Sequence, residues 1–511
     1  MTIWTSVLER FEQQAPASVM ARVALEHALP REWIDTVFEE HRQRQYSREL
    51  LFSTVIEAVT LVSLGLRPSL HAAARNLETL PVSVSALYDK VSRTEPAILR
   101  ALVRGSAERL GSVAAGWSHG PSLPGWQLRV LDGNHLPASE KRLAPLRGHR
   151  GAALPGHTLV VYDPDGGLVT DIVPSEDAHQ SERAAVGPLL DCAEPGQLWV
   201  ADRQVCTRTI LLGWEAAQAS FLVREHGRHP QVAAEGPWRA GGRTDTGAVR
   251  EQRIELAGAC QPWRRIELTL DTPTEAGESV IRLWSNLPER IEARQIAQLY
   301  RRRWCVEGMF QRLEAALQSE IRSLGHPRAA LLGFAVAVLA YNVLAVLQRC
   351  IEQVHRATHP SLQVSVYHLA LQIRRGYEGM LIALPAEPWL ANDAADPATV
   401  AEYLTRLAHN VVPRQLALLW YFRSVLRNST MAVRTTIRNR RRSEQPGDDG
   451  AADLRQRGLR RRPGGVHLFP PDPQPSGAGV VDRRKRCRSS ARAGAGRSRT
   501  DPRSRRARAL A

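Results

Sequence analysis

The chain has 511 residues and a formal net charge of +16. This length exceeds one ordinary domain, so two or three folded units are expected. Residues 434–511 hold 22 Lys and Arg against 7 Asp and Glu, so the remainder is close to neutral and the basic character belongs to a tail. Six scattered cysteines without a C-x-x-C pair argue against a zinc site or a disulfide framework. Together with a start that lacks a secretory pattern, they predict a cytoplasmic protein.

Residues 1–118 predict a helical N-terminal domain. The sequences SLHAAARNL (69–77) and VSVSALYDKVSR (82–93) are typical of two helices separated by a short break. Such a pair can enter a DNA groove, with Arg75, Lys90 and Arg93 near the phosphates. Two helices that pack into a core, with solvated charges, would have the same pattern, and both interpretations stay open.

Residues 119–225 change to a pattern of strands and helices. WQLRVLD (126–132), HTLVVYD (157–163) and GLVTDIVP (167–174) are strand-like, and a helix over 178–193, a strand, a helix and a strand follow. This order predicts an α/β ribonuclease H-like fold, in which helices flank a mixed sheet. The later divisions expected are a β-rich insertion (226–290), the second part of the catalytic domain with C-terminal helices (291–438), and a disordered Arg-rich tail (439–511).

Residues 329–347 are apolar for long enough to span a membrane. Asn342 interrupts the stretch, and charged residues crowd its approach. A helix buried on all sides in a large domain has the same composition. We therefore predict a core helix and no membrane span.

Three carboxylates form the candidate site. Asp132 ends the first predicted strand in VLDGNH, and Asp202 ends the fourth in VADRQVC. These strands are neighbours in the expected fold, so the two carboxylates should converge beyond the strand ends. Glu307 lies in QLYRRRWCVEGMFQRLEAAL, where spacings of three and four place Tyr300, Arg303 and Glu307 on one helix face.

Clustered carboxylates suit divalent metal chemistry on phosphodiesters. Two ions about 3.5–4 Å apart can stabilise both the attacking and the departing oxygen. Mg²⁺ prefers oxygen ligands and open positions, and clustered acids need a cation to remain ionised together. We therefore expect Mg²⁺ or Mn²⁺, as two ions, at Asp132, Asp202 and Glu307.

The segments VLDGNHL, VADRQVCT and the helix Y-x-x-R-x-x-x-E resemble the three signature blocks of DDE transposases of bacterial insertion sequences, the group with a Tyr-Arg-Glu-Lys motif. The resemblance covers about residues 40–430. It implies a catalytic metal-binding triad of Asp132, Asp202 and Glu307, with Tyr300 and Arg303 contacting DNA. Trp304 and Arg203, beside these residues, are further candidates for DNA-binding or packing roles.

The same resemblance implies cut-and-paste transposition, by metal-dependent cleavage and strand transfer. The DNA partners would be terminal inverted repeats and target DNA, bound by a synaptic homodimer. The expected location is the bacterial cytoplasm, at the nucleoid.

One position departs from the family pattern. The Lys of the motif falls seven residues after the Glu, where this chain has Glu314, and an anion there would repel phosphates. Arg312 is close in sequence but should point elsewhere on the helix. An impaired DNA-binding remnant of a transposase is therefore a second hypothesis, and a ribonuclease H-like nuclease is a third. The tail could grip DNA non-specifically, or could come from a frameshift.

Overall fold

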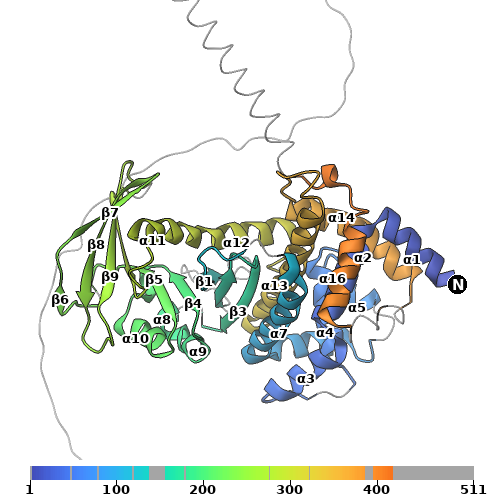
Figure 1. Cartoon of the computed structure of the whole chain (residues 1–511). Coiled ribbons are helices and arrows are strands. Elements are labelled where there is room, and N and C mark those ends of the chain that lie inside the picture. The colour runs from blue at the N-terminus through green and yellow to red at the C-terminus, as the bar shows by residue number, and fades with distance from the viewer. Residues whose placement is uncertain are drawn as a thin grey trace, which may run out of the picture. The chain divides into compact units, whose positions relative to one another are not determined.

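The computed structural model describes residues 3–417, except 47–48, 77–79, 118–119, 137–155, 178–179, 229, 275–276, 322, 386–388 and 390–394. These residues belong to one compact unit, Met1–Arg438. Figure 1 shows a sheet on one side of this unit and a helical body on the other. The Arg-rich tail predicted for 439–511, including its possible frameshift origin, lies outside the described residues.

A ten-stranded mixed sheet forms the centre of the fold. Its order is β3-β2-β1-β4-β5-β10-β9-β8-β6, and β7 pairs with β8. β1 pairs in parallel with β4, and β4 with β5, while the other pairs are antiparallel. The predicted mixed sheet flanked by helices is thus confirmed. The strands are β1 (Gln127–His135), β2 (His157–Asp163), β3 (Leu168–Ser175), β4 (Gln197–Ala201), β5 (Ser220–Arg224), β6 (Ala234–Glu235), β7 (Arg239–Thr244), β8 (Gly247–Glu255), β9 (Trp263–Leu270) and β10 (Val280–Ser285).

Two local predictions from the sequence were wrong. β1 continues three residues beyond Asp132, because Gly133, Asn134 and His135 still pair with β2. The single helix expected over 178–193 is instead two short helices, α8 (Glu182–Ala185) and α9 (Gly187–Leu190). Pro188, in the first turn of α9, has no backbone N–H and so cannot continue the hydrogen-bonding of α8.

The strands expected in the β-rich insertion extend the same sheet. β10 pairs with β5, and β9 and β8 follow outward. Residues 239–244 also form a strand, β7, which the sequence RAGGRT did not predict because its two glycines weaken a strand pattern.

Helices cover both faces of the sheet. One face buries Leu128, Val130 and Val200 against the larger core, and the other buries Trp199 and Phe221 in a second core. α8, α9 and α10 (Arg208–Ala216) pack on the second core. The remaining helices are α1 (Ile3–Gln14), α2 (Pro16–Ala28), α3 (Arg31–His41), α4 (Phe52–Ser63), α5 (Leu70–Asn76), α6 (Val84–Arg93), α7 (Pro96–Ala114), α11 (Ala293–Tyr300), α12 (Cys305–Ala316), α13 (Pro327–Val354), α14 (Val366–Ala383) and α16 (Pro397–Ala408), with the 3-10 helices η1 (Ala115–Trp117), η4 (Arg203–Val205), η5 (Arg301–Trp304) and η6 (Pro413–Gln415).

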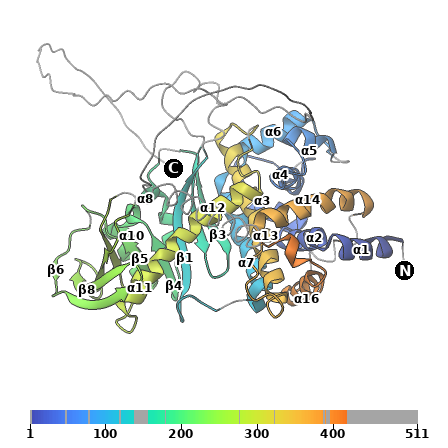
Figure 2. The same ribbon diagram turned by 90° about the horizontal axis from the view of Figure 1, so that it is seen from above.

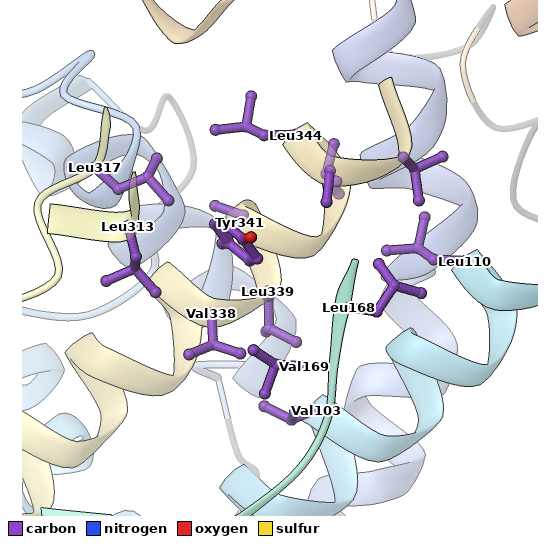
Figure 3. Close-up of a cluster of buried hydrophobic side chains, with 14 of the residues drawn as sticks. Val103, Leu110, Leu168, Val169, Leu313, Leu317, Val338, Leu339, Tyr341 and Leu344 are labelled. Carbon is purple, nitrogen blue, oxygen red and sulfur yellow. The ribbon is translucent and has the colours of Figure 1, made fainter. Parts of the chain in front are cut away.

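The apolar helix α13 is the axis of the helical body. It packs against α2, α4, α6, α7, α14 and α16, so the N-terminal and C-terminal helices share one core. Figure 3 shows part of this core, where Val338, Leu339 and Tyr341 of α13 meet Val169 of β3 and Leu313 of α12. Among the described residues, α13 is the one helix long and apolar enough to cross a membrane, and its apolar window is wholly buried in the fold.

Of the N-terminal residues expected near DNA phosphates, Lys90 is not available. Its ammonium donates to the Leu50 carbonyl at 2.6 Å and lies 4.5 Å from the centroid of the Phe38 ring. Burial lowers the pKa of Lys90. Arg75 and Arg93 are exposed, so they stay candidates for phosphate contacts.

Candidate functional site

The central strands β1, β4 and β5 bring charged side chains together near the C-terminal ends of β4 and β5. Leu131, Ala201 and Val223 are neighbours in register on β1, β4 and β5. The residues that directly follow these three in the sequence are Asp132, Asp202 and Arg224. Adjacent strands of a sheet lie about 4.8 Å apart. Because side chains alternate between faces, these residues project towards the larger core, whereas Leu131, Ala201 and Val223 face the second core.

The third candidate acid comes from the segment α11–η5–α12, which crosses this face of the sheet (Figure 2). The hydroxyl of buried Tyr300 donates to Asp202 Oδ1 at 3.4 Å. Arg303 donates through Nη1 to Asp132 Oδ2 at 3.5 Å and through Nη2 to Glu307 Oε1 at 3.3 Å. All five residues predicted for the core of the site therefore lie together.

The helix that carries them is not continuous as predicted. α11 ends at Tyr300, the four residues Arg301–Trp304 form a 3-10 turn, and α12 begins at Cys305. A 3-10 turn has three residues per turn instead of 3.6, so it rotates the following side chains relative to a regular helix. Tyr300, Arg303 and Glu307 nevertheless reach the same pair of aspartates.

Burial controls the ionisation of Asp132. Loss of solvent raises its pKa to about 6, Arg303 opposes the shift, and Glu182 and Glu307 add to it. An acid in this position needs a nearby cation to be fully ionised at neutral pH. Arg303, which is 8% exposed, supplies part of that charge.

Glu182 is a fourth carboxylate at the site that the sequence did not reveal. It belongs to the short helix α8, and a Cβ on Gly133 would collide with its Oε1, so the absence of a side chain at 133 makes room for it. Burial, and then the charge of Asp202, raise the pKa of Glu182. No motif or strand end marks this residue in the sequence, because only the tertiary fold brings α8 to Asp132.

Trp304 and Arg203, the weaker DNA-binding candidates, lie at the rim. Trp304 is 58% exposed, and the Arg303 guanidinium lies 4.7 Å from the centroid of its ring. Arg203 follows Asp202, and its Nη1 lies 3.5 Å from Oε1 of Glu278. Neither side chain contributes to the buried part of the site.

The other arginines of η5 attach this segment to its surroundings. Arg301 binds Asp245 in the β7–β8 turn at 2.6 Å. Arg302 binds Asp165 in the β2–β3 turn at 2.9 Å. Salt bridges on both sides thus hold the 3-10 turn over the sheet while Arg303 points into the site.

The site has the donor chemistry for a divalent ion, although Arg303 lies between the acids. Asp132, Glu182, Asp202 and Glu307 supply only oxygen ligands, the type Mg²⁺ and Mn²⁺ prefer. Within the described residues, no group of three or more His, Cys, Asp or Glu side chains is arranged so that it could hold a metal ion. The guanidinium bridges Asp132 and Glu307, so those two acids share a cation of the protein itself.

Glu314, which takes the place of the Lys in the family motif seven residues after Glu307, lies on the surface of α12. Glu314 is exposed. Arg312 does not replace the missing cation, because its guanidinium donates to the hydroxyls of Tyr162 at 3.4 Å and Tyr341 at 3.3 Å. Its predicted orientation away from the position of Glu314 agrees with these contacts.

Comparison with known proteins matches the segment that holds this site. Residues 127–343 match the family model described as transposase DDE domain, and Asp132, Asp202 and Glu307 all fall within them. No curated protein matches the chain. A cryo-EM structure of a piggyBac transposase synaptic complex with hairpin DNA aligns over 75% of this chain and 86% of that chain, with 9% identity and a TM-score of 0.35. Residues 127–343 therefore resemble a transposase DDE domain, and this match supports a DNA transposase function.

Proposed function

We propose that this transposase cleaves DNA and transfers strands with two Mg²⁺ or Mn²⁺ ions held by Asp132, Asp202 and Glu307. The observation that supports the assignment is that one segment contacts all three acids: Arg303 bonds Asp132 of β1 and Glu307 of α12, and Tyr300 bonds Asp202 at the end of β4. When bound, the ions would supply an activated water and stabilise charge on the attacking and leaving oxygens.

Arg303 has to leave its position between Asp132 and Glu307 when an ion binds there. Its two bonds to the acids are long, at 3.5 and 3.3 Å, and its buried Nε has no hydrogen-bond partner. Moving this side chain therefore breaks only weak contacts. The released guanidinium can then donate two parallel bonds to a DNA phosphate beside the metal site.

Tyr300 and Trp304 complete the proposed DNA contacts. Tyr300 shares its hydroxyl with Asp202, so it can position that carboxylate or donate to a phosphate once the ion is bound. Trp304 offers an exposed ring to a nucleobase, since stacking is favourable for every base. Glu182 is close enough to affect both aspartates and is a candidate fourth acid.

The proposed substrates are the terminal inverted repeats of a bacterial insertion sequence and its target DNA, within a cut-and-paste reaction. We further propose a synaptic homodimer acting in the cytoplasm, at the nucleoid. The Tyr-Arg-Glu-Lys group stays the proposed subgroup, with Glu314 as its departure.

That departure favours a second candidate function, a transposase remnant that binds transposon ends without cutting them. Exposed Glu314 adds negative charge on α12, seven residues after Glu307, and Arg312 is engaged with two tyrosines. The metal-binding acids are all retained, so such a remnant would fail in DNA binding before it failed in metal binding.

The test is cleavage of DNA that carries the gene's own flanking repeats, with Mg²⁺ or Mn²⁺, by the whole chain. Glu307→Gln should abolish nicking and strand transfer, while Glu292→Gln, an exposed acid on the same segment that pairs with Arg294, should leave both intact. Nicking without strand transfer products would favour a nuclease. Equal cleavage by both variants would exclude the proposed triad.

Metal binding can be measured apart from catalysis. An ion that binds only the folded state raises its stability by about 2.7 kcal/mol at a concentration 100 times its dissociation constant. The melting temperature of the wild type should therefore rise with Mn²⁺, and the rise should vanish in Glu307→Gln. DNA binding with a metal-dependent melting shift, but without cleavage, would support the remnant.

A further inference from the structure

Beside the acids lies a second cluster, formed by two arginines and one glutamate. Arg224 ends β5 next to Asp202 in the sheet, and Arg203 directly follows Asp202. Glu278, from the loop before β10, reaches both: its Oε2 lies 2.6 Å from Arg224 Nη2, and its Oε1 lies 3.5 Å from Arg203 Nη1. Each carboxylate oxygen thus faces one guanidinium.

The proposed catalytic chemistry does not use this cluster. Glu278 faces two cations at the rim of the site, and the bond from Arg224 lowers its pKa. The side chains of Arg203 and Glu278 are 50% and 32% exposed, so solvent reaches this pair. The side chain of Arg224 is less accessible, at 19% exposed. Arg203 and Arg224 thus form a partly exposed anion-binding site that is occupied by the Glu278 carboxylate.

We propose that Arg203 and Arg224 bind a backbone phosphate of the DNA beside the catalytic acids, and that Glu278 occupies this phosphate site until DNA displaces it. This inference rests on the proposed DNA-cleaving function and names a contact that neither the family match nor the triad supplies.

The energetics favour such an exchange. A partly exposed ion pair contributes little to stability because water screens it, so removing Glu278 from the two arginines costs little. A phosphate presents two oxygens to the arginine pair as the carboxylate does, and arginine is suited to bidentate contacts with either group. Because Glu278 sits in a loop of the strands beyond β5, its displacement leaves the sheet unchanged.

The location also gives the contact a role in positioning. Arg224 is one strand away from Asp202, about 4.8 Å along the sheet. A phosphate held by Arg203 and Arg224 would therefore fix the strand on the side of Asp202 opposite to Asp132. The DNA would be held on both sides of the acids, by this pair and by Arg303.

The experiment measures DNA affinity without a divalent ion, which separates it from cleavage. Fluorescence anisotropy of a labelled duplex with the flanking repeats is titrated with the whole chain across a range of salt concentrations. Glu278→Gln removes the competing charge and should raise affinity about 3-fold to 10-fold. Arg224→Gln should lower affinity and reduce the slope of log K against log salt by about 0.9, the value for one phosphate contact.

Two controls test whether the effect passes through the arginines. Glu289→Gln removes an equally charged glutamate from another exposed pair, with Arg253, and should change affinity less than Glu278→Gln. In a chain that also carries Arg203→Gln and Arg224→Gln, the gain from Glu278→Gln should disappear. A gain that persists without the arginines, or that Glu289→Gln equals, would overturn the proposal.

The design remains decisive if Arg224→Gln fails to fold. Arg203→Gln alters a half-exposed side chain and should by itself remove part of the gain from Glu278→Gln. An unchanged gain in that background, or unchanged affinity in Glu278→Gln itself, would contradict displacement. If these DNA-binding results hold while no variant cleaves DNA, the phosphate site stands and the catalytic proposal fails.

Discussion

Asn342, the polar residue within the apolar helix α13, should be among the most costly residues to replace in this protein. It is fully buried, and its amide bonds both backbone groups of Val169: Oδ1 accepts from the N–H at 2.8 Å, and Nδ2 donates to the C=O at 2.8 Å. β3 is the edge strand of the sheet. The Asn342 amide therefore makes the two hydrogen bonds to Val169 that a neighbouring strand would otherwise make, at a position that water cannot reach.

Asn342→Leu removes both bonds while keeping a side chain of similar size. Each buried backbone group left without a partner costs about 1–3 kcal/mol, so the pair costs roughly 2–6 kcal/mol. Burial of an apolar side chain returns about 1.5–3 kcal/mol. Taking the middle of each range, we expect a net destabilisation of about 2 kcal/mol and a melting temperature lower by about 2 °C, since about 1 kcal/mol shifts a folded unit of roughly 440 residues by roughly 1 °C.

Denaturation in urea, followed by circular dichroism, measures the loss, and hydrogen exchange at the Val169 amide should become faster. Asn286 offers a matched comparison, because it makes the same two kinds of bond, from Phe221 N–H and to Ala219 C=O, but is only partly buried. Solvent can replace part of what Asn286→Leu removes, so that variant should lose less stability. Equal losses, or a loss below about 1 kcal/mol in Asn342→Leu, would refute the reasoning.

Three further outcomes test the site and its surroundings. Asp132→Asn should abolish cleavage and the Mn²⁺-dependent rise in melting temperature, yet leave the metal-free fold at least as stable, because burial already disfavours the charged carboxylate; retained metal stabilisation would remove Asp132 from the ligand set. Glu314→Lys should strengthen binding to DNA ends several-fold in anisotropy, with a steeper salt dependence, because it changes an anion to a cation on exposed α12; unchanged affinity would place this face away from DNA. Lys90→Met should leave DNA affinity within about 2-fold, since its ammonium is enclosed by Leu50 and Phe38; a marked loss would show that this ammonium reaches DNA.

The strands around the site could be predicted from the sequence because each buries one or both faces and ends in a polar residue. Val130, Val200 and Leu222 pack into one core while Leu131, Trp199 and Phe221 pack into the other, so apolar runs mark these strands clearly. β7 lacked such a run. The 3-10 turn at Arg301–Trp304 was also missed, since helical spacing and a short tightening of the same helix leave nearly the same pattern.

The charged residues of the site also divide into those that local sequence predicts and those that only the tertiary structure reveals. Asp132 and Asp202 follow buried strand residues, and Glu307 shares a motif with Tyr300 and Arg303, so local sequence identified them. Arg224 carried a similar signal, as the last residue of β5, and it could have been recognised by the rule that selected Asp202. Glu182 and Glu278 come from a short helix and a loop, and only tertiary structure brings them to the acids.

The arginines around the site explain why a near-neutral folded part can act on DNA. Arg203 and Arg224 pair with Glu278, Arg301 with Asp245, Arg302 with Asp165, and Arg303 with Asp132 and Glu307. Each of these five arginines is therefore paired with at least one carboxylate of the protein. Under the proposed function, binding of DNA to this face would be an exchange, in which phosphates replace carboxylates as partners of the guanidinium groups and metal ions replace Arg303 as the partner of the acids. Such an exchange would couple DNA binding to metal binding at Arg303, because a phosphate that binds the guanidinium would free Asp132 and Glu307 for the ion, and an ion that binds the acids would free the guanidinium for the phosphate.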